Sequence, residues 1–203
     1  MRRRDPHHEA LAALAAFAGE GRFAWGEPLV ATALAAELGL SPTPVREALA
    51  RLAGEGLIEH RPGRGYYAPS PGADDVADLY ELHRRLTHWA LDLLEKSPSP
   101  LWPVDPQGRS PEQVFTEIVR APALPVLARN HWRVTLQLRP IRRLEAGRDD
   151  PDPGWEALAT ALRKPQDLAS IRRGVDAYHS DRIRRAPETA AEMRRGAESI
   201  VQI

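Results

Sequence analysis

A short run of polar side chains, Ser41, Thr43 and Arg46, carries hydrogen-bonding groups that suit recognition of a nucleic acid. The run SPTP at 41–44 follows Gly39 and is typical of a helix start, where proline and small oxygen side chains are favoured. Arginine can form two hydrogen bonds to a guanine edge or bind a phosphate, and hydroxyl groups can also bond phosphates. The run therefore predicts a polar helix N-terminus directed at DNA.

Two helices are expected to position these side chains. The first covers about Leu29 to Leu38, and the second runs from Ser41 to about Ala53, with Ser41 or Thr43 as its cap. Only the turn at 39–41 separates them, which is typical of a helix-turn-helix. The side chains expected to hold the two helices together are apolar: Leu34, Leu38, Val45, Leu49 and Leu52.

A β-hairpin is expected after the second helix. Two short β-prone runs, 57–60 and 66–68, flank a tip of sequence RPGRG at 61–65. The glycines in this tip permit a close approach to DNA, and Arg61 and Arg64 would lie near its backbone. With a further helix at about 6–18 in front, this pattern predicts a winged helix-turn-helix.

The string LGLSPTPVREALARLAGEGLI at 38–58, continued by the RPGRG tip, resembles the signature of the GntR family of bacterial transcription regulators. This resemblance implies that operator DNA is contacted by residues of both helices and of the wing: Thr32, Ser41, Thr43, Arg46, Gly63 and Arg64. Thr32 falls on a phosphate-contact position. Pro42 stands between the Ser and the Thr, where family members often carry Arg, so one base-reading side chain is missing.

The rest of the chain has helical patterns only. Helices are expected at about 73–96, 111–120, 122–146, 153–163 and 166–185, with a tail beyond Pro187 that is helical or frayed. Pro140 should kink the third of these helices. The fold class is therefore mostly α: residues 1–70 form the winged helix-turn-helix, and residues 71–203 form an all-α helical bundle.

This second part resembles the FadR-type effector domain, often called FCD, over about residues 75–185. Many such domains hold a divalent metal with one Asp and three His. The resemblance places Glu112 at the acidic ligand position and Thr116, Trp155 and Tyr178 at the His positions. Thr and Trp are not ordinary metal ligands, so we expect no metal at this place and no other cofactor.

Three histidines, His83, His131 and His179, lie on different expected helices and could converge. One interpretation is a metal site rebuilt from these residues; the other is that they are ordinary core or surface histidines. The residues considered for an effector pocket are His83, Glu112, Thr116, His131, Trp155, Tyr178 and His179. A small organic acid or another metabolite is the class of ligand expected.

Composition narrows the remaining possibilities. The 203 residues include no Cys and equal numbers of basic and acidic side chains, 28 of each. No apolar run approaches the ~20 residues of a membrane span, and no nucleophile–base pair or phosphate loop indicates an enzyme. We expect a cytoplasmic protein without a membrane partner.

The sequence thus predicts a repressor or activator that binds a palindromic operator as a homodimer and is controlled by a small-molecule effector. The alternative is that the helical domain serves only for dimerisation and binds no effector. Helix 73–96 is apolar on more than one face, so it can pack against both its own bundle and a second copy.

Overall fold

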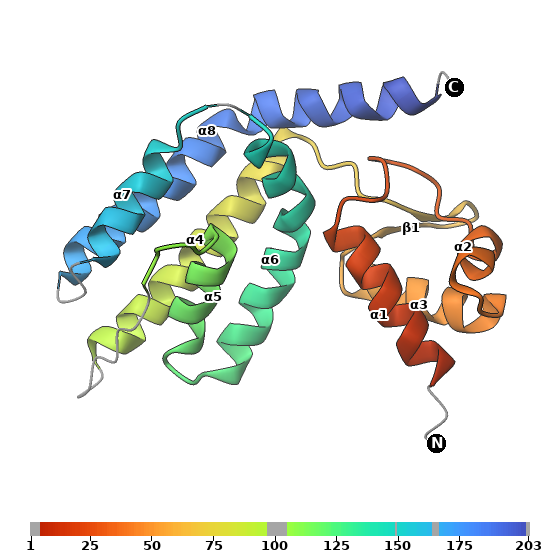
Figure 1. The fold of residues 1–203 in the computed structure, drawn as a ribbon, viewed down its shortest axis with the longest axis horizontal. Coiled ribbons are helices and arrows are strands. Elements are labelled where there is room, and N and C mark those ends of the chain that lie inside the picture. Colours follow the sequence, from red (N-terminus) through yellow and green to blue (C-terminus); the bar gives the residue numbers. More distant parts are fainter. Residues whose placement is uncertain (1–4, 97–104, 149, 164–166, 202–203) are drawn as a thin grey trace. The chain divides into compact units, whose positions relative to one another are not determined.

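The computed structural model of the chain describes residues 5–96, 105–148, 150–163 and 167–201, with side chains described to 196. The fold is mostly α-helical, with one small two-stranded sheet (Figure 1). Contacts divide the chain into two compact units. The first, here called the winged-helix unit, contains residues up to Pro71, together with Arg139–Glu145 and the end of the last helix from Thr189. The second, the helical unit, contains residues 72–138 and 146–188.

The winged-helix unit has three helices, α1 (Pro6–Gly19), α2 (Ala31–Leu38) and α3 (Pro42–Gly54), followed by the strands β1 (Glu59–Arg61) and β2 (Gly65–Tyr67). α1 begins at Pro6 because the Asp5 carboxylate accepts a hydrogen bond from the amide of His7, 3.0 Å away. α3 packs against both other helices, and its apolar face is buried. The buried side chains of this core include Ala10, Leu14, Leu34, Val45, Leu49 and Leu52.

The turn between α2 and α3 depends on Gly39, which has a left-handed conformation with φ of 65°. Glycine adopts this conformation without steric cost. The turn sets the angle at which α3 leaves α2. Ser41 is the first residue before α3, but its side chain makes no capping hydrogen bond. The expected cap by the Ser41 hydroxyl is therefore wrong, and that hydroxyl remains exposed.

The hairpin pairs β1 and β2 in antiparallel register, with Glu59 opposite Tyr67 and Arg61 opposite Gly65. At its tip, the amide of Arg64 donates to the carbonyl of Arg61 at 2.9 Å, and Gly63 has φ of 73°. Proline followed by a glycine with positive φ is typical of a type II turn. The stretch 27–29 bonds the other edge of β2, through Leu29 N to Tyr66 O and Ala68 N to Glu27 O.

The helical unit is formed by α4 (Ala73–Glu95), α5 (Pro111–Arg120), α6 (Pro125–Ala146), α7 (Pro153–Leu162) and α8 (Leu168–Val201). Ser110 caps α5 by accepting from the amide of Gln113, whose side chain accepts from the amide of Ser110 in return. Two glycines bring α7 and α8 together: a Cβ on Gly174 would lie 2.7 Å from Leu158 Cα, and one on Gly154 would lie 2.7 Å from Tyr178 Cα.

The expected helices of this unit are present, and their ends lie within about three residues of the expected ends, except for the last one. The tail beyond Pro187 is helical, since α8 continues to Val201. α6 likewise continues through Pro140. Residues 97–104, between α4 and α5, lie outside the described residues. Among the helices within the described ranges, none combines the length and apolar character needed to cross a membrane.

Candidate nucleic-acid interface

α3 separates its apolar and polar side chains onto two faces. Val45, Leu49 and Leu52 are buried against α1 and α2, whereas Ser41, Thr43 and Arg46 are exposed. The structure therefore places these three predicted contact residues together along the first turns of one helix. Pro42 lies among them and is half-buried, and Thr32 is exposed at the start of α2. Gly63 and Arg64 are exposed at the hairpin tip.

Most of the arginines in residues 5–71 form ion pairs with glutamates of the same segment. Arg22 lies 2.5 Å from Glu37, Arg51 lies 3.1 Å from Glu55, and Arg61 lies 2.8 Å from Glu59. Within the described residues 5–71, the two arginines without such a carboxylate partner are Arg46 and Arg64. One is on α3 and the other on the hairpin tip, so the arginines of residues 5–71 that lack a carboxylate partner lie on the two predicted contact elements.

Arg61, which the sequence predicts to lie near the DNA backbone, is paired within the wing. Its guanidinium donates two hydrogen bonds to the Glu59 carboxylate and lies over the ring of Tyr67, 4.1 Å from the ring centre. Strand geometry explains this arrangement, because residues two apart on β1 and the residue opposite on β2 share one face of the sheet. The charge of Arg61 is therefore neutralised within the wing.

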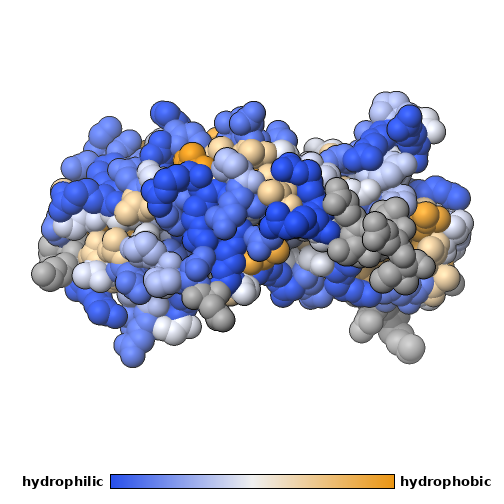
Figure 2. Space-filling model, turned by 90° about the horizontal axis from the view of Figure 1, so that it is seen from above, coloured by the Kyte–Doolittle hydropathy of each residue, from blue (hydrophilic) through white to orange (hydrophobic). Residues whose placement is uncertain are grey.

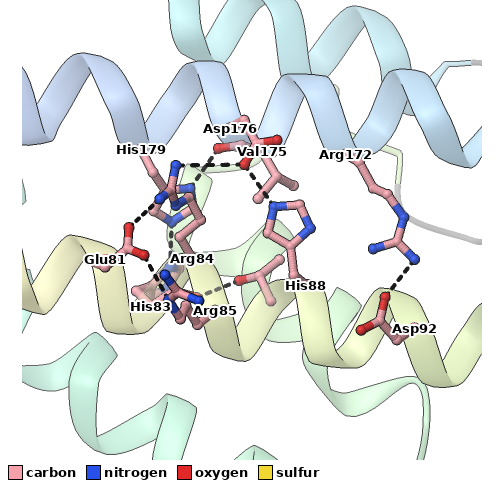
Figure 3. A network of polar contacts seen from close by, with 11 residues as sticks. Glu81, His83, Arg84, Arg85, His88, Asp92, Arg172, Val175, Asp176 and His179 are labelled. Carbon is pink, nitrogen blue, oxygen red and sulfur yellow. Dashed lines mark hydrogen bonds and ion pairs between the residues drawn. The ribbon is translucent and has the colours of Figure 1, made fainter.

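In the helical unit, the three histidines do converge. His83 Nδ1 lies 2.8 Å from His179 Nε2, and the rings of His83 and His131 are 4.4 Å apart. All three side chains are buried. His179 Nδ1 lies 2.7 Å from the carbonyl of Val175 and must carry a proton to donate to it, so Nε2 accepts and His83 Nδ1 donates. Figure 3 shows this contact between α4 and α8.

Further polar contacts accompany the buried histidine contact at the edge of the α4–α8 interface (Figure 3). His88 of α4 lies 2.8 Å from Asp176 of α8, and Arg172 of α8 lies 2.7 Å from Asp92 of α4. These contacts are partly exposed, so each contributes at most about 1 kcal/mol to stability. They join the same two helices that carry His83 and His179.

Aromatic rings pack around the buried histidines His83, His131 and His179, which together are called the polar cluster below. Phe115 of α5 contacts His83, His179 and Tyr178, with ring centres 4.9 to 5.1 Å apart. Of the other residues considered for a pocket, Glu112 and Thr116 are half-buried on the same helix α5, and Trp155 is half-buried near the start of α7. The Thr116 hydroxyl oxygen is itself buried and has no hydrogen-bond partner among the described residues.

The donor chemistry of the cluster does not suit a metal ion. Both ring nitrogens of His179 are engaged, one with Val175 and one with His83. At the positions where the resemblance to FCD domains would place metal ligands, only Glu112 is a good donor, since Thr116 and Trp155 are not ordinary ligands. Over the described part of the chain, no three or more His, Cys, Asp or Glu side chains are placed to hold a metal. The interpretation of a rebuilt metal site is therefore not supported by this geometry.

Arg182 belongs to the same region but was missed by the sequence reasoning. Its guanidinium lies over the ring of Tyr178, 3.5 Å from the ring centre, and bonds the Asp152 carboxylate at 2.5 Å. Burial acts to lower the pKa of Arg182, but the charge interaction with Tyr178 and the hydrogen bond to Asp152 together raise it. The i, i+4 spacing of Tyr178 and Arg182 was the available signal.

Comparison with known proteins identifies the first part of the chain. Residues 8–67 match the model of bacterial regulatory proteins of the gntR family. This segment is a GntR-family helix-turn-helix domain. The Nta operon transcriptional regulator of Aminobacter aminovorans is 41% identical over 68 residues, which are 34% of this chain and 32% of that protein. The chain thus aligns with about a third of the length of the curated relative it matches.

Two solved structures share the fold over nearly the whole chain. E. coli McbR/YncC has a TM-score of 0.68 and 18% identity, covering 92% of this chain and 99% of its own. A transcriptional regulator GntR from Rhodococcus sp. RHA1 has a TM-score of 0.64 and 17% identity, covering 89% and 96%. The arrangement of a GntR-type domain with a helical region is therefore a fold shared with these proteins.

Proposed function

We propose that the chain is a sequence-specific DNA-binding transcription regulator that recognises a palindromic operator. The observation that carries this proposal is the position of Arg46 and Arg64, the arginines of the described winged-helix residues 5–71 that have no carboxylate partner. Arg46 lies on the helix that enters the major groove in a helix-turn-helix, and Arg64 lies on the wing. The exposed Ser41, Thr43 and Thr32 supply further hydrogen-bonding groups beside them.

Footprinting on the DNA upstream of the protein's own gene tests this function. A regulator of this kind protects two half-sites related by a two-fold axis and separated by one helical turn or a multiple of it. Protection of a single asymmetric site would argue against a palindrome. Binding that does not distinguish this DNA from a duplex of scrambled sequence would argue against sequence-specific regulation.

We also propose that the protein acts as a homodimer through α4. Five large apolar side chains recur every three or four residues along α4 and so form one stripe: Leu79, Leu82, Leu86, Trp89 and Leu93. None of them is among the buried residues of the core, and Leu82 and Trp89 are 48% and 45% exposed. The surface seen in Figure 2 is mostly hydrophilic, so a continuous apolar stripe is unusual and indicates a binding surface.

A second copy of the same helix fits this stripe. Its spacing of three and four residues is the pattern by which helices pair along an apolar seam. In an antiparallel pair, Leu86 of each copy packs against Trp89 of the other, and this register brings Arg85 of each copy near Asp92 of the other. Both charged side chains remain largely exposed, 76% for Arg85 and 54% for Asp92, despite contacts within their own chain.

For the helical unit, we propose a diverged FCD-type domain that senses a small molecule at the polar cluster. The supporting observation is the buried, unpartnered hydroxyl of Thr116. An unsatisfied buried polar group costs about 1–3 kcal/mol, and a ligand with a hydrogen-bonding group would remove that cost. The cluster's histidines and Tyr178 line the same bundle interior.

A thermal-shift screen with organic acids separates this proposal from a domain that serves only for dimerisation. A sensor gains stability in proportion to the logarithm of ligand concentration, whereas a dimerisation module shows no shift with any acid. The variant Thr116→Val provides the matched control, since it keeps the shape of the side chain and removes the hydroxyl. It should abolish the shift without lowering the stability of the ligand-free protein.

A further inference from the structure

The wing contains a carboxylate, that of Glu59, whose two oxygens both accept hydrogen bonds. One oxygen of Glu59 accepts both hydrogen bonds from the Arg61 guanidinium, at 3.1 and 2.8 Å. The other oxygen accepts from the backbone amide of Ser70 at 3.1 Å. Glu59 therefore joins strand β1 to the start of the segment that leaves the wing, and it determines where the Arg61 charge lies.

The two arginines of the wing differ in their ion pairing. Arg64, at the tip, is exposed and makes no ion pair among the described residues. Arg61, three residues earlier, is paired with Glu59 and also covers the ring of Tyr67. A cation already neutralised by a carboxylate has no net charge to exchange for the counterions of DNA. The difference between the two arginines therefore bears directly on how many phosphates the wing neutralises.

We propose that Glu59 is a positioning residue that withholds Arg61 from the DNA backbone, so that the wing engages phosphate through Arg64 alone. This inference rests on the proposed DNA-binding function and adds a limit on its electrostatic part. Because non-specific affinity grows with each phosphate neutralised, withholding one cation from each protomer lowers binding to any DNA. Base recognition by α3 is unaffected, so Glu59 changes the phosphate part of the affinity equally for specific and non-specific DNA.

The test measures how DNA affinity falls with salt. The probe is a mixed-sequence duplex long enough for two protomers, and binding is followed by fluorescence anisotropy over a salt series. The proteins compared are the full-length wild type, Glu59→Gln, Arg61→Gln and the double variant. Glutamine keeps an oxygen for the Ser70 amide, so the segment after the wing stays anchored. Glu9→Gln removes the same charge from the exposed first turn of α1 and serves as the control.

We expect Glu59→Gln to steepen the dependence of log affinity on log salt by about 0.9 for each protomer bound. Over a fourfold rise in salt, this slope difference corresponds to an additional loss of about threefold in affinity for each protomer. Arg61→Gln alone should leave the slope as in the wild type, and the double variant should return to it. Glu9→Gln should leave the slope unchanged.

Two results would overturn the proposal. A shallower slope for Arg61→Gln alone would mean that Arg61 already leaves Glu59 to bind phosphate. A steeper slope retained in the double variant would mean that Glu59 acts by its own repulsion of DNA and not through Arg61. If circular dichroism shows that Glu59→Gln does not fold, the slope for Arg61→Gln still decides whether Arg61 binds phosphate in the wild type. A wild-type protein that binds no duplex would instead refute the DNA-binding function itself.

Discussion

Replacing Arg46 with Ala should weaken operator binding without affecting the fold. The Arg46 side chain is exposed on α3, while its neighbours Val45 and Leu49 are buried and hold the helix in place. Loss of one recognition-helix arginine costs about 1–3 kcal/mol of binding free energy. In the proposed complex, two protomers bind one palindrome and the two substitutions lie in separate half-sites, so the costs add to about 2–6 kcal/mol per dimer.

The assay is equilibrium binding at fixed salt to the DNA protected in footprinting, with thermal unfolding measured in parallel. Arg51→Ala is the matched control, because Arg51 lies on the same helix but is paired with Glu55 at i, i+4. Losing that exposed pair should change stability by no more than about 0.5 kcal/mol and leave affinity nearly unchanged. Unchanged affinity for Arg46→Ala together with weakened binding for Arg51→Ala would show that another face of α3 meets DNA.

Three further predictions concern the helical unit. Leu82→Glu combined with Trp89→Glu should give a monomer by light scattering, and a dimer retained at micromolar concentration would contradict the α4 seam. Gly174→Ala should lower the melting temperature by an amount equivalent to about 1–3 kcal/mol, because its Cβ would lie 2.7 Å from the backbone of α7; Gly196→Ala, which meets nothing within 4 Å, is the control. Elemental analysis of protein purified without an affinity tag should find no stoichiometric metal, and a metal lost on Glu112→Ala would refute this.

The helices could be predicted from sequence because their boundaries are marked by local chemistry. Asp5 before Pro6, Ser110 before Pro111 and Asp152 before Pro153 each pair a capping side chain with a proline that fits the first turn. The hairpin was equally predictable from the RPGRG tip. Local signals of this kind depend on residues a few positions apart, which the sequence displays directly.

The sequence could not show which side chains pair across the fold. The histidines on α4, α6 and α8 are 48 residues or more apart in the chain, and only packing of the three helices brings them together. The apolar spacing on α4 likewise showed that a stripe exists but not that Leu82 and Trp89 face away from the bundle, because Val76, Tyr80 and Leu91 fill the other face. Burial depends on the neighbouring helices as well as on the helix itself.

Residues 1–71 carry eight arginines and eight aspartates and glutamates, so this segment has no basic excess. Arg22, Arg51 and Arg61 each lie against a glutamate of their own unit, so composition counts charges that are not available to DNA. Long-range attraction to a phosphate backbone depends on net charge and on the cations free to displace counterions. In the proposed mode of binding, affinity comes mainly from short-range contacts, including those of Arg46 and Arg64, made by both protomers of the proposed dimer. The proposed α4 seam would then contribute to recognition as well as α3.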